Sequence, residues 1–269
     1  MFQNLRKSKK LLLIAMTCAT FAIAGCGSDT TKTTADNGPS VTWSETFDGT
    51  KTDFAVKSAP THAVSMSQAT TEMMLQLGLE DKMAGTAFKE EEIYPPLQAA
   101  YDKVKVLSEK WPSYEVFMSV KPDFATGWPD SFSKRAIPAD KMISQKVNIW
   151  IPESMLSTKA DLETNFSDMI KLGEIFGVKP KAEEWVSGQR KTLAAIQDKL
   201  KDLPRKRIFI YDSEDGQPFT AFEGYTTNIL KLIGADNVMS GLGVDKTWAK
   251  GSWETVIAQN PDYIIIADY

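Results

Sequence analysis

Few residues in this sequence are suited to catalysis. The chain of 269 residues has a single His, and His62 lies in the alternating stretch HAVSMS, a pattern that favours a structural role within a strand. An enzyme would need a nucleophile, a base and an orienting group at close quarters, or a metal. The sequence has no Gly-x-Ser-x-Gly elbow, P-loop or complete dinucleotide-binding fingerprint, since Gly241-Leu242-Gly243 lacks the third glycine. We therefore expect no catalytic residue, no metal site and no resident cofactor.

Aromatic residues are the more informative set, because several follow predicted strands or begin predicted helices. Ligands of α/β proteins favour the carboxyl ends of parallel strands, and flat rings suit a large, partly apolar, planar ligand. Trp128 is the strongest candidate, since Gly127 and Pro129 place it in a turn, and Arg135 is a candidate partner for a ligand carboxylate or catecholate. The alternatives are that the rings plug edges of the fold and that the cation is a solvated surface charge. The predicted ligand-binding residues are Phe88, Trp111, Trp128, Phe132, Arg135, Tyr225 and Trp248.

The first 26 residues have the composition of an export signal. Basic residues precede an apolar run of fourteen residues, 11–24, which is shorter than the roughly 20 residues that span a bilayer. The run ends in Ile23-Ala24-Gly25-Cys26, which resembles the lipobox of bacterial lipoproteins, where cleavage precedes the Cys and acyl chains are added to it. We expect a signal peptide over 1–25 and lipidation of Cys26, which would anchor the protein on the outer face or periplasmic side of the cell membrane. An ordinary cleavage site beside a chance Cys is the alternative.

A spacer and a hairpin follow the signal. Residues 26–40 are rich in Thr, Ser, Asp and Gly and are predicted to form a lipid-anchored flexible tether. Residues 41–47 and 51–56 flank Asp48-Gly49, which favours a hairpin turn. The formal net charge is −4, which gives no reason to expect a nucleic-acid partner.

From Pro60 onward, short apolar strands alternate with helical patterns, as in an α/β domain with a mostly parallel sheet. Apolar residues between 162 and 176 recur at helical spacing, and a second helical pattern runs from Pro180 to residue 203. Another strand-like stretch, 207–211, restarts the alternation. The early strands are predicted at 62–67, 82–85, 105–107, 123–126 and 147–151, and the helices between them at 68–77, 94–103, 114–120 and 132–145.

Two pairs of segments repeat in the same order, which indicates two related α/β lobes. Residues 71–78 and 227–234 both run from Thr to Gly through a helical pattern. Residues 113–123 and 252–262 both run from Ser, through an aromatic residue and Glu, to Pro-Asp. Chance similarity between helix ends is the alternative. We expect a ligand cleft between an N-terminal lobe over 41–158 and a C-terminal lobe over 205–269, with a helical bridge over 159–204.

Together these features resemble the substrate-binding lipoproteins of ABC importers. The resemblance rests on the lipobox, the tether, the Thr-Glu-x-x-x-x-Leu-Gly-Leu helix that starts at Thr71, and the Pro-Asp units at 112–123 and 252–262. The most similar class is the helix-bridged one, which binds iron–siderophores, cobalamin and haem. The resemblance implies two three-layer α/β lobes with mostly parallel sheets, joined by one rigid interlobe helix, so that closure on the ligand is small.

The resemblance also implies a docking partner. In the family, a Glu at this helix position of each lobe faces the importer and pairs with Arg residues of the permease. Glu72 matches in the first lobe, whereas the equivalent position of the second lobe is Asn228, which brings no charge. We therefore expect permease docking at Glu72 and Asn228, with charge on one side only. An unpartnered surface Glu is the alternative.

The expected function is that a monomer captures an iron–siderophore or a similar metal chelate outside the cell and delivers it to the permease of an ABC importer. Cobalamin or haem uptake is one alternative, and a sensor or scaffold lipoprotein is the other. Direct recognition of free zinc or manganese is disfavoured by the single His. The chain stops after a strand at 264–267, where the repeat predicts a further helix and strand, so we expect a fragment or an abbreviated, incomplete second lobe with its last strand at an exposed edge.

Overall fold

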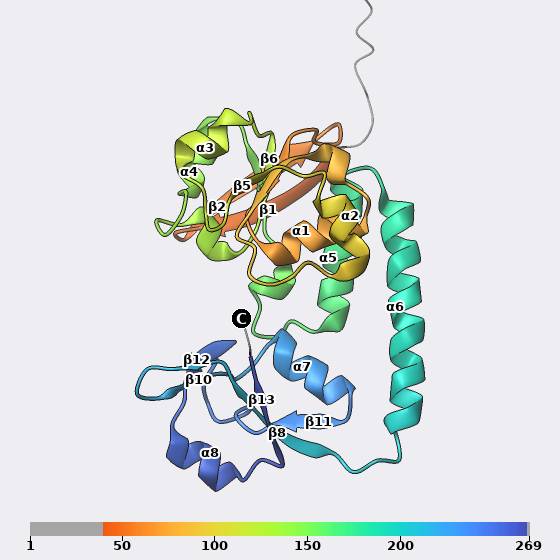
Figure 1. Cartoon of the computed structure of the whole chain (residues 1–269), viewed down its shortest axis with the longest axis vertical. Coiled ribbons are helices and arrows are strands. Elements are labelled where there is room, and N and C mark those ends of the chain that lie inside the picture. The colour runs from red at the N-terminus through yellow and green to blue at the C-terminus, as the bar shows by residue number, and fades with distance from the viewer. Residues whose placement is uncertain (1–39, 268–269) are drawn as a thin grey trace, which may run out of the picture. The chain divides into compact units, whose positions relative to one another are not determined.

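The computed structural model describes residues 40–267 (Figure 1). The predicted signal peptide, the lipidation site Cys26, the tether up to residue 39 and the terminal Tyr269 lie outside these residues. Within the described range, no helix combines the length and apolar character needed to cross a membrane.

A β-hairpin opens the described part of the chain, as the sequence predicts. β1 (Val41–Phe47) pairs with β2 (Thr50–Val56) in an antiparallel register. Asp48 and Gly49 between them have φ angles of 47° and 78°. Positive φ at both central positions gives the turn the twist that matches the flanking strands, which is why Asp-Gly predicts a hairpin so well.

The N-terminal lobe is built on a five-stranded parallel sheet with the order β5-β4-β3-β6-β7. The α/β architecture with a mostly parallel sheet is therefore confirmed in this lobe. Each strand is a short apolar run bounded by polar or turn residues, and this pattern located all of them to within about two residues. The strands are β3 (Ala63–Ser65), β4 (Met83–Ala87), β5 (Val106–Ser108), β6 (Phe124–Thr126) and β7 (Asn148–Trp150).

Helices cover both faces of this sheet. Phe124 and Ala125 of β6 point to opposite faces and belong to different hydrophobic clusters. Met74 of α1 belongs to the same cluster as Phe124, whereas Phe117 of α3 and Met142 of α4 belong to that of Ala125. The helices are α1 (Gln68–Gln76), α2 (Gln98–Tyr101), α3 (Tyr114–Ser119) and α4 (Ala139–Ser144), with single 3-10 turns at η1 (Glu80–Lys82), η2 (Pro95–Leu97), η3 (Pro129–Phe132) and η4 (Glu153–Met155).

Two of the predicted helices are shorter than expected, and proline is the reason. The predicted helix over 94–103 begins with the 3-10 turn η2, and only its second half is α-helical. The predicted helix over 132–145 is wrong in its first half, since α4 begins directly after Pro138. Proline disfavours helical backbone in the residue before it, so a helix starts at Pro138 more readily than it continues through it.

Two helices connect the lobes along the chain. α5 (Leu162–Ile175) begins with a capping box in which the Asp161 side chain accepts from the backbone amide of Thr164. Its apolar face is buried in the core of the N-terminal lobe. α6 (Lys179–Leu200) has 22 residues and is about 33 Å long. Among its residues only Ala182 and Val186, both near the start of the helix, are buried. The other end of α6 leads into β8, the first strand of the C-terminal lobe.

The C-terminal lobe also has a parallel sheet, with the order β11-β8-β13. Its central strand coincides with the predicted strand at 207–211. β13 lies at an edge of this sheet, and Ile264 and Ile266 in it are 56% and 67% exposed. The predicted edge position of the last strand is thus observed among the described residues. The elements are β8 (Lys206–Tyr211), α7 (Tyr225–Leu232), β11 (Ala235–Asn237), α8 (Trp253–Gln259) and β13 (Tyr263–Ile266).

A second sheet in this lobe was not predicted. β9 (Ser213–Glu214) and β12 (Trp248–Lys250) both pair antiparallel with β10 (Pro218–Ala221). The strands are very short, and two of them are separated by α7 and β11. Hydrophobic periodicity cannot detect a pairing of this kind, because it depends on segments distant in the sequence.

The internal repeat has the same structural meaning in both lobes. Asp123 accepts hydrogen bonds from the backbone amide of His62 at 3.0 Å, and Asp262 accepts one from that of Arg207 at 2.8 Å. Each contact joins a Pro-Asp turn to the start of the central strand of its own parallel sheet, β3 in the first lobe and β8 in the second. Ser113 and Ser252 likewise each cap the helix that precedes this turn. The repeat in the sequence therefore marks equivalent helix–turn–strand units.

Candidate ligand-binding site

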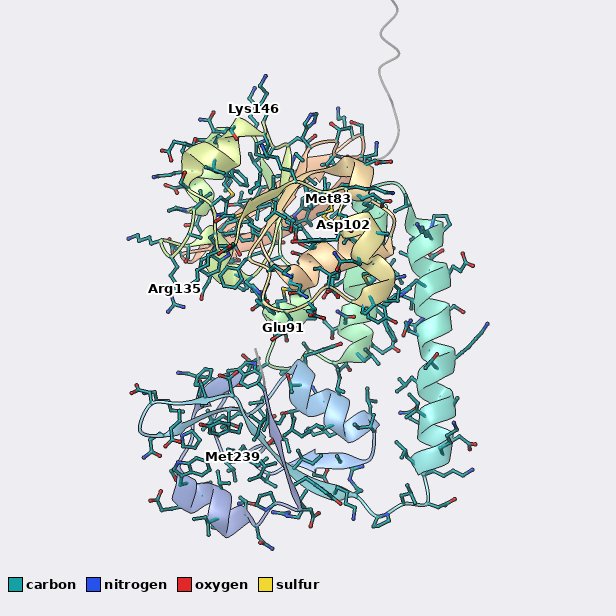
Figure 2. The ribbon with its side chains drawn as sticks, viewed as in Figure 1. Met83, Glu91, Asp102, Arg135, Lys146 and Met239 are labelled. Carbon is teal, nitrogen blue, oxygen red and sulfur yellow. The ribbon has the colours of Figure 1, made fainter. Side chains whose placement is uncertain are left out.

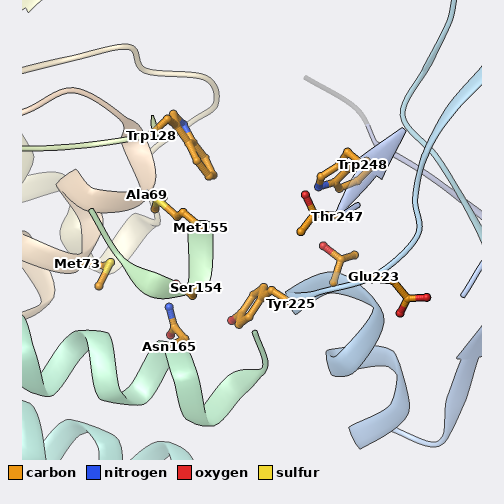
Figure 3. A pocket seen from close by; sticks show the side chains of 11 residues that line it. Ala69, Met73, Trp128, Ser154, Met155, Asn165, Glu223, Tyr225, Thr247 and Trp248 are labelled. Carbon is orange, nitrogen blue, oxygen red and sulfur yellow. The ribbon is translucent and has the colours of Figure 1, made fainter. Parts of the chain in front are cut away.

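A pocket of about 440 Å³ is lined by side chains from both lobes. Figure 3 shows the rings of Trp128 and Trp248 on facing sides of this pocket, with Tyr225 below them in this view. The volume lies in the range of small-molecule sites, and the walls combine rings with a few polar groups, as such sites usually do. The lining residues are Ala69, Met73, Trp128, Ser154, Met155, Asn165, Glu223, Tyr225, Thr226, Thr247 and Trp248.

Trp128 is positioned by a close packing contact at the end of β6. A Cβ atom on Gly127 would lie 2.8 Å from the Cβ of Met66 and 2.9 Å from the Oγ of Ser131. Both distances are shorter than van der Waals contact, so this position requires glycine. Trp128 then caps the 3-10 turn η3 with extended backbone, at φ −63° and ψ 152°. The indole is therefore carried on a turn whose path is fixed by packing.

Tyr225 begins α7 and depends on another glycine. Gly224 has φ +86°, and a Cβ atom there would lie 2.7 Å from the Cγ2 of Thr247 and 3.3 Å from the carbonyl oxygen of Ser157. Ser157 lies at the end of the predicted N-terminal lobe and Thr247 lines the pocket. The start of α7 thus approaches both segments more closely than any residue with a side chain allows. Burial raises the pKa of the Tyr225 phenol, and the nearby charge of Asp168 raises it further.

Trp248 comes from the antiparallel sheet that the sequence did not predict. It begins β12 and stacks on Phe219 of β10, with ring centroids 6.1 Å apart and an angle of 21° between the planes. Ala221 of β10 is its strand partner. The ring therefore rests on a paired strand and not on a loop, which restricts its motion.

The 3-10 turn η4 forms a further wall of the pocket, and a buried carboxylate holds it. Asp168 in α5 is 5% exposed, and its two oxygens accept hydrogen bonds from the backbone amides of Glu153 and Ser154, both at 2.9 Å. Burial raises the pKa of Asp168, and these hydrogen bonds oppose the rise. Sequence reasoning missed this residue, because an Asp inside an amphipathic helix is expected on its exposed face.

Glu223 brings a carboxylate to the pocket from the loop before α7. It accepts hydrogen bonds from the Oγ of Ser240 at 3.0 Å and from the backbone amide of Gly241 at 2.7 Å. Neither partner carries a charge, so the negative charge of Glu223 is oriented by these contacts but not neutralised. In the sequence, Glu223 is only weakly indicated as a site residue, because it directly precedes Gly224 and Tyr225 at the start of the predicted helix.

Phe88 and Trp111 form a pair of their own and do not line this pocket. Their rings stack with centroids 4.6 Å apart, and the Trp111 Nε1 donates to the carbonyl oxygen of Met66 at 3.0 Å. Phe88 has φ +60°, a strained value for a bulky residue. Met66 also packs against the Gly127 position, so the stacked pair supports the turn that carries Trp128.

Phe132 and Arg135 also lie away from this pocket. Phe132 is 4% exposed and packs edge-on against Phe47 of the hairpin, with centroids 6.4 Å apart. Arg135, labelled in Figure 2, has a 73% exposed side chain and pairs with Asp130 at 2.6 Å. The structure therefore brings together three of the seven predicted ligand-binding residues, Trp128, Tyr225 and Trp248. Phe132 was expected at the site because the hairpin that covers it is remote in the sequence, so that local patterns could not show its burial.

The two predicted docking residues have partners within the chain. One carboxylate oxygen of Glu72 accepts from the Nε2 of Gln68 at 2.9 Å and from the backbone amide of Tyr94 at 3.1 Å. The Nδ2 of Asn228 donates to the carbonyl oxygen of Ala160 at 2.8 Å. Glu72 is thus half-buried and held by two uncharged donors, whereas Asn228 joins α7 to the segment before α5.

No resident metal centre is evident where the structure describes the chain, since nowhere from residue 40 to 267 do three or more His, Cys, Asp or Glu side chains gather in a possible metal site. Such groups are what a protein needs to hold a bare divalent cation. The pocket itself offers aromatic rings, thioethers, hydroxyls, amides and one carboxylate. This set suits a ligand that brings its own polar groups.

Sequence and structure comparisons agree with this architecture. The chain is 26% identical over 269 residues to YvrC, an ABC transporter substrate-binding lipoprotein of Bacillus subtilis (strain 168), covering 97% of this chain and 82% of that one. It is 23% identical over 211 residues to a vitamin B12-binding protein of Yersinia pestis, covering 78% and 70% of the two chains. The crystal structure of a periplasmic binding protein from Veillonella parvula matches with 97% identity and a TM-score of 0.85, over 86% of this chain and 78% of that chain.

A family model settles the relationship. The model described as "Periplasmic binding protein" matches residues 64–269, which comprise most of the chain and both parallel sheets. The resemblance of the sequence to the substrate-binding proteins of ABC importers is thereby confirmed. This chain belongs to the periplasmic binding protein family.

Proposed function

We propose that this protein captures a metal chelate outside the cytoplasm, an iron–siderophore or a similar complex, and delivers it to the permease of an ABC importer. The observation that carries the proposal is the pocket in which Trp128 of one lobe faces Trp248 of the other (Figure 3). Two rings on facing walls can stack on both faces of a flat or partly apolar ligand. Each ring is mounted on a rigid element, which reduces the entropy that binding costs.

The relatives support both parts of this proposal, the role in an ABC importer and the chelate as ligand. YvrC is by name a substrate-binding lipoprotein of an ABC transporter, and its similarity extends over 97% of this chain. The Yersinia relative is by name a vitamin B12-binding protein, and a corrin is an organic chelate of a metal. A pocket that contains rings, neutral polar groups and a single carboxylate is in keeping with a metal that arrives already complexed.

Anchoring and organisation are part of the same proposal. Cys26 would carry the acyl chains, and the Thr/Ser-rich tether up to residue 40 would hold the binding lobes near the membrane. α6 would be the interlobe bridge, since α5 is packed into one lobe whereas α6 has few buried residues. Replacement of the lipidated residue, Cys26→Ser, should release the protein from the membrane fraction, and retention of the variant there would contradict the anchor.

Ligand binding tests the central claim. The detergent-solubilised full-length protein would be titrated with ferric hydroxamate chelates, cyanocobalamin and haemin, with calorimetry as the readout and tryptophan fluorescence as a second one. We expect at least one chelate to bind, and Trp128→Ala to weaken that binding by roughly tenfold to a hundredfold, since removal of an aromatic ring that stacks on a planar group costs about 1–3 kcal/mol. Trp253→Ala, a tryptophan of the C-terminal lobe that does not line the pocket, is the matched control.

The outcomes separate the candidate functions. Binding of cyanocobalamin or haemin alone would select the corrin or porphyrin alternative. If none of the probes binds, delivery of a chelate is excluded, and the sensor or scaffold alternative takes its place. Equal losses in Trp128→Ala and Trp253→Ala would place the ligand somewhere other than this pocket.

A further inference from the structure

The pocket between Trp128 and Trp248 is lined by one carboxylate and by no cationic side chain among the residues that the structure describes. The carboxylate is Glu223, whose hydrogen-bond partners Ser240 and Gly241 are uncharged. This charge balance is the reverse of what a site for an anionic ligand provides, because such sites use Arg or Lys to pair with the ligand.

Two further carboxylates lie close to the lining residues. Asp168 is buried behind η4, where it binds the backbone amide of the lining residue Ser154, and its charge raises the pKa of Tyr225. Glu90, an exposed residue, lies beside the indole of Trp128; desolvation of its carboxyl raises its pKa, and the contact with this indole opposes the rise. Negative charge is therefore present on the C-terminal wall of the pocket, from Glu223, and close to its N-terminal wall, from Asp168 and Glu90.

Arg135, the cation predicted for the ligand, and Lys250, the last residue of β12, are both engaged elsewhere. Arg135 pairs with Asp130 at 2.6 Å, and Lys250 pairs with Asp215 at 2.7 Å. Neither of the two lines the pocket. Lys246 comes closest in the sequence, next to the lining residue Thr247. Its side chain is exposed, and its backbone carbonyl oxygen accepts a hydrogen bond from the backbone amide of Glu223 at 3.0 Å.

We propose that this pocket selects metal chelates by charge, binding uncharged or positively charged complexes and rejecting anionic ones. The proposal rests on the proposed function, since it concerns the ligand of that same site. Carboxylates that are partly withdrawn from water act through a lower effective dielectric than in bulk solvent, so they repel a ligand carboxylate or catecholate over several ångströms. The aromatic walls supply attraction that does not depend on the ligand's sign, and they add a favourable cation–π component for a positive group.

The selectivity can be measured with chelates that differ only in one terminal group. Ferrioxamine B, a ferric trishydroxamate with a terminal ammonium, would be compared with its N-acetyl derivative, which is uncharged, and with its N-succinyl derivative, which ends in a carboxylate. We expect affinity to fall in that order, by about tenfold between the uncharged and the carboxylate-bearing chelates at low salt. The difference should shrink as the salt concentration rises, because screening weakens it.

Two variants assign the effect to the pocket. Glu223→Gln keeps an oxygen that accepts the Gly241 amide but removes the charge, and it should improve binding of the succinylated chelate relative to ferrioxamine B. Glu90→Gln tests the opposite wall in the same way and remains informative if the first variant is unstable. Glu254→Gln, an exposed site on α8, is the control with the same charge change and should leave the order and the ratio unaltered.

The possible results are distinct. If the succinylated chelate binds as tightly as the other two, charge selection is wrong and chelate capture stands. If the order is as expected but neither Glu223→Gln nor Glu90→Gln changes it, these carboxylates are not its source and the inference is overturned. If no hydroxamate, cyanocobalamin or haemin binds at all, the proposed function fails and the inference fails with it.

Discussion

The Asp168 carboxylate accepts a hydrogen bond from the backbone amide of Ser154 at 2.9 Å and so fixes the wall of the pocket that Ser154 lines. On the other side of the same segment, Glu45 accepts from the backbone amide of Ile151 at 3.0 Å. Two buried acids from β1 and α5 thus hold the chain where it leaves β7. The geometry of the pocket therefore depends on residues that lie outside it.

The Asp168→Asn variant should loosen this wall. The amide that replaces the carboxylate has one oxygen acceptor, and its nitrogen would face a backbone N–H, so one of the two amides at Glu153 and Ser154 loses its partner. We expect hydrogen exchange at these two amides to accelerate by about tenfold and chelate affinity to fall severalfold, in keeping with the loss of one hydrogen bond. Asp140→Asn, at an exposed position of α4, should change neither measurement. Unchanged exchange in Asp168→Asn would contradict the positioning role.

Glu45 should make the stability of the protein depend on pH. It is 6% exposed, and its pKa is raised from 4.5 to about 7, chiefly by burial, while the Ile151 hydrogen bond lowers it and the charges of Glu153 and Asp168 raise it. Since the folded protein holds this proton more tightly than the unfolded chain, the stabilisation is fully present below about pH 4.5 and is lost as pH rises through about 7. The free energy of unfolding should fall by about 3 kcal/mol across this window from this group, since each pKa unit corresponds to about 1.4 kcal/mol.

Urea unfolding of Glu45→Gln and Glu184→Gln at a series of pH values measures this contribution. The first substitution removes the buried titration and keeps an oxygen for the Ile151 amide, so its stability should decline less between about pH 5 and about pH 8 than that of the natural protein. The second alters an exposed position of α6 and should leave the pH slope unchanged. Parallel curves for all three proteins would show that Glu45 titrates normally.

The parts of the fold that the sequence predicts well are those encoded by local patterns. The strands of the first parallel sheet are short apolar runs, and Asp48-Gly49 predicts the hairpin. The Pro-Asp turns were identified by their repetition, and the structure shows that Asp123 and Asp262 both bind backbone amides at the start of a strand. In each of these cases the determining interaction is local or occurs twice in the chain.

The parts that could not be predicted depend on contacts between distant segments. Trp248 was selected by ring type, but the strand that holds it pairs with β10, nearly thirty residues earlier. Phe132 was expected to face the ligand, whereas it is covered by the hairpin residue Phe47. Asp168 and Glu45 are buried by tertiary packing, and no pattern in a single sequence distinguishes them from exposed acids.

Gly224 provides a test of the close approach at the start of α7. An alanine there would combine an unfavourable positive φ with a methyl group 2.7 Å from Thr247 and 3.3 Å from the carbonyl oxygen of Ser157. We expect Gly224→Ala to destabilise the protein by about 2–3 kcal/mol and to weaken chelate binding, since Thr247 must move. Gly216→Ala is a matched control, because Gly216 has φ +71° but nothing within 4 Å of its Cβ position. It should cost only about 1 kcal/mol and leave binding intact, and similar effects of both substitutions on binding would refute the role of the close contact.

Docking to a permease should depend on Glu72 more than on Asn228. Glu72→Gln retains an oxygen for the amide of Tyr94 but removes the charge that would pair with a permease Arg. In liposomes that contain the importer, we expect this variant to bind chelate normally and to stimulate ATP hydrolysis severalfold less than the natural protein. Glu115→Gln on α3 is the control for loss of a surface carboxylate.

Asn228 should respond differently, because its side chain already has a structural partner. Asn228→Glu would replace the donor to the Ala160 carbonyl oxygen with a carboxylate that faces this oxygen. We expect a loss of about 1–2 kcal/mol in stability and no gain in stimulation of ATP hydrolysis, whereas Asn228→Ala should be milder because it adds no repulsion. A stable Asn228→Glu variant with enhanced stimulation would show that the two lobes dock symmetrically and that the Ala160 contact is dispensable.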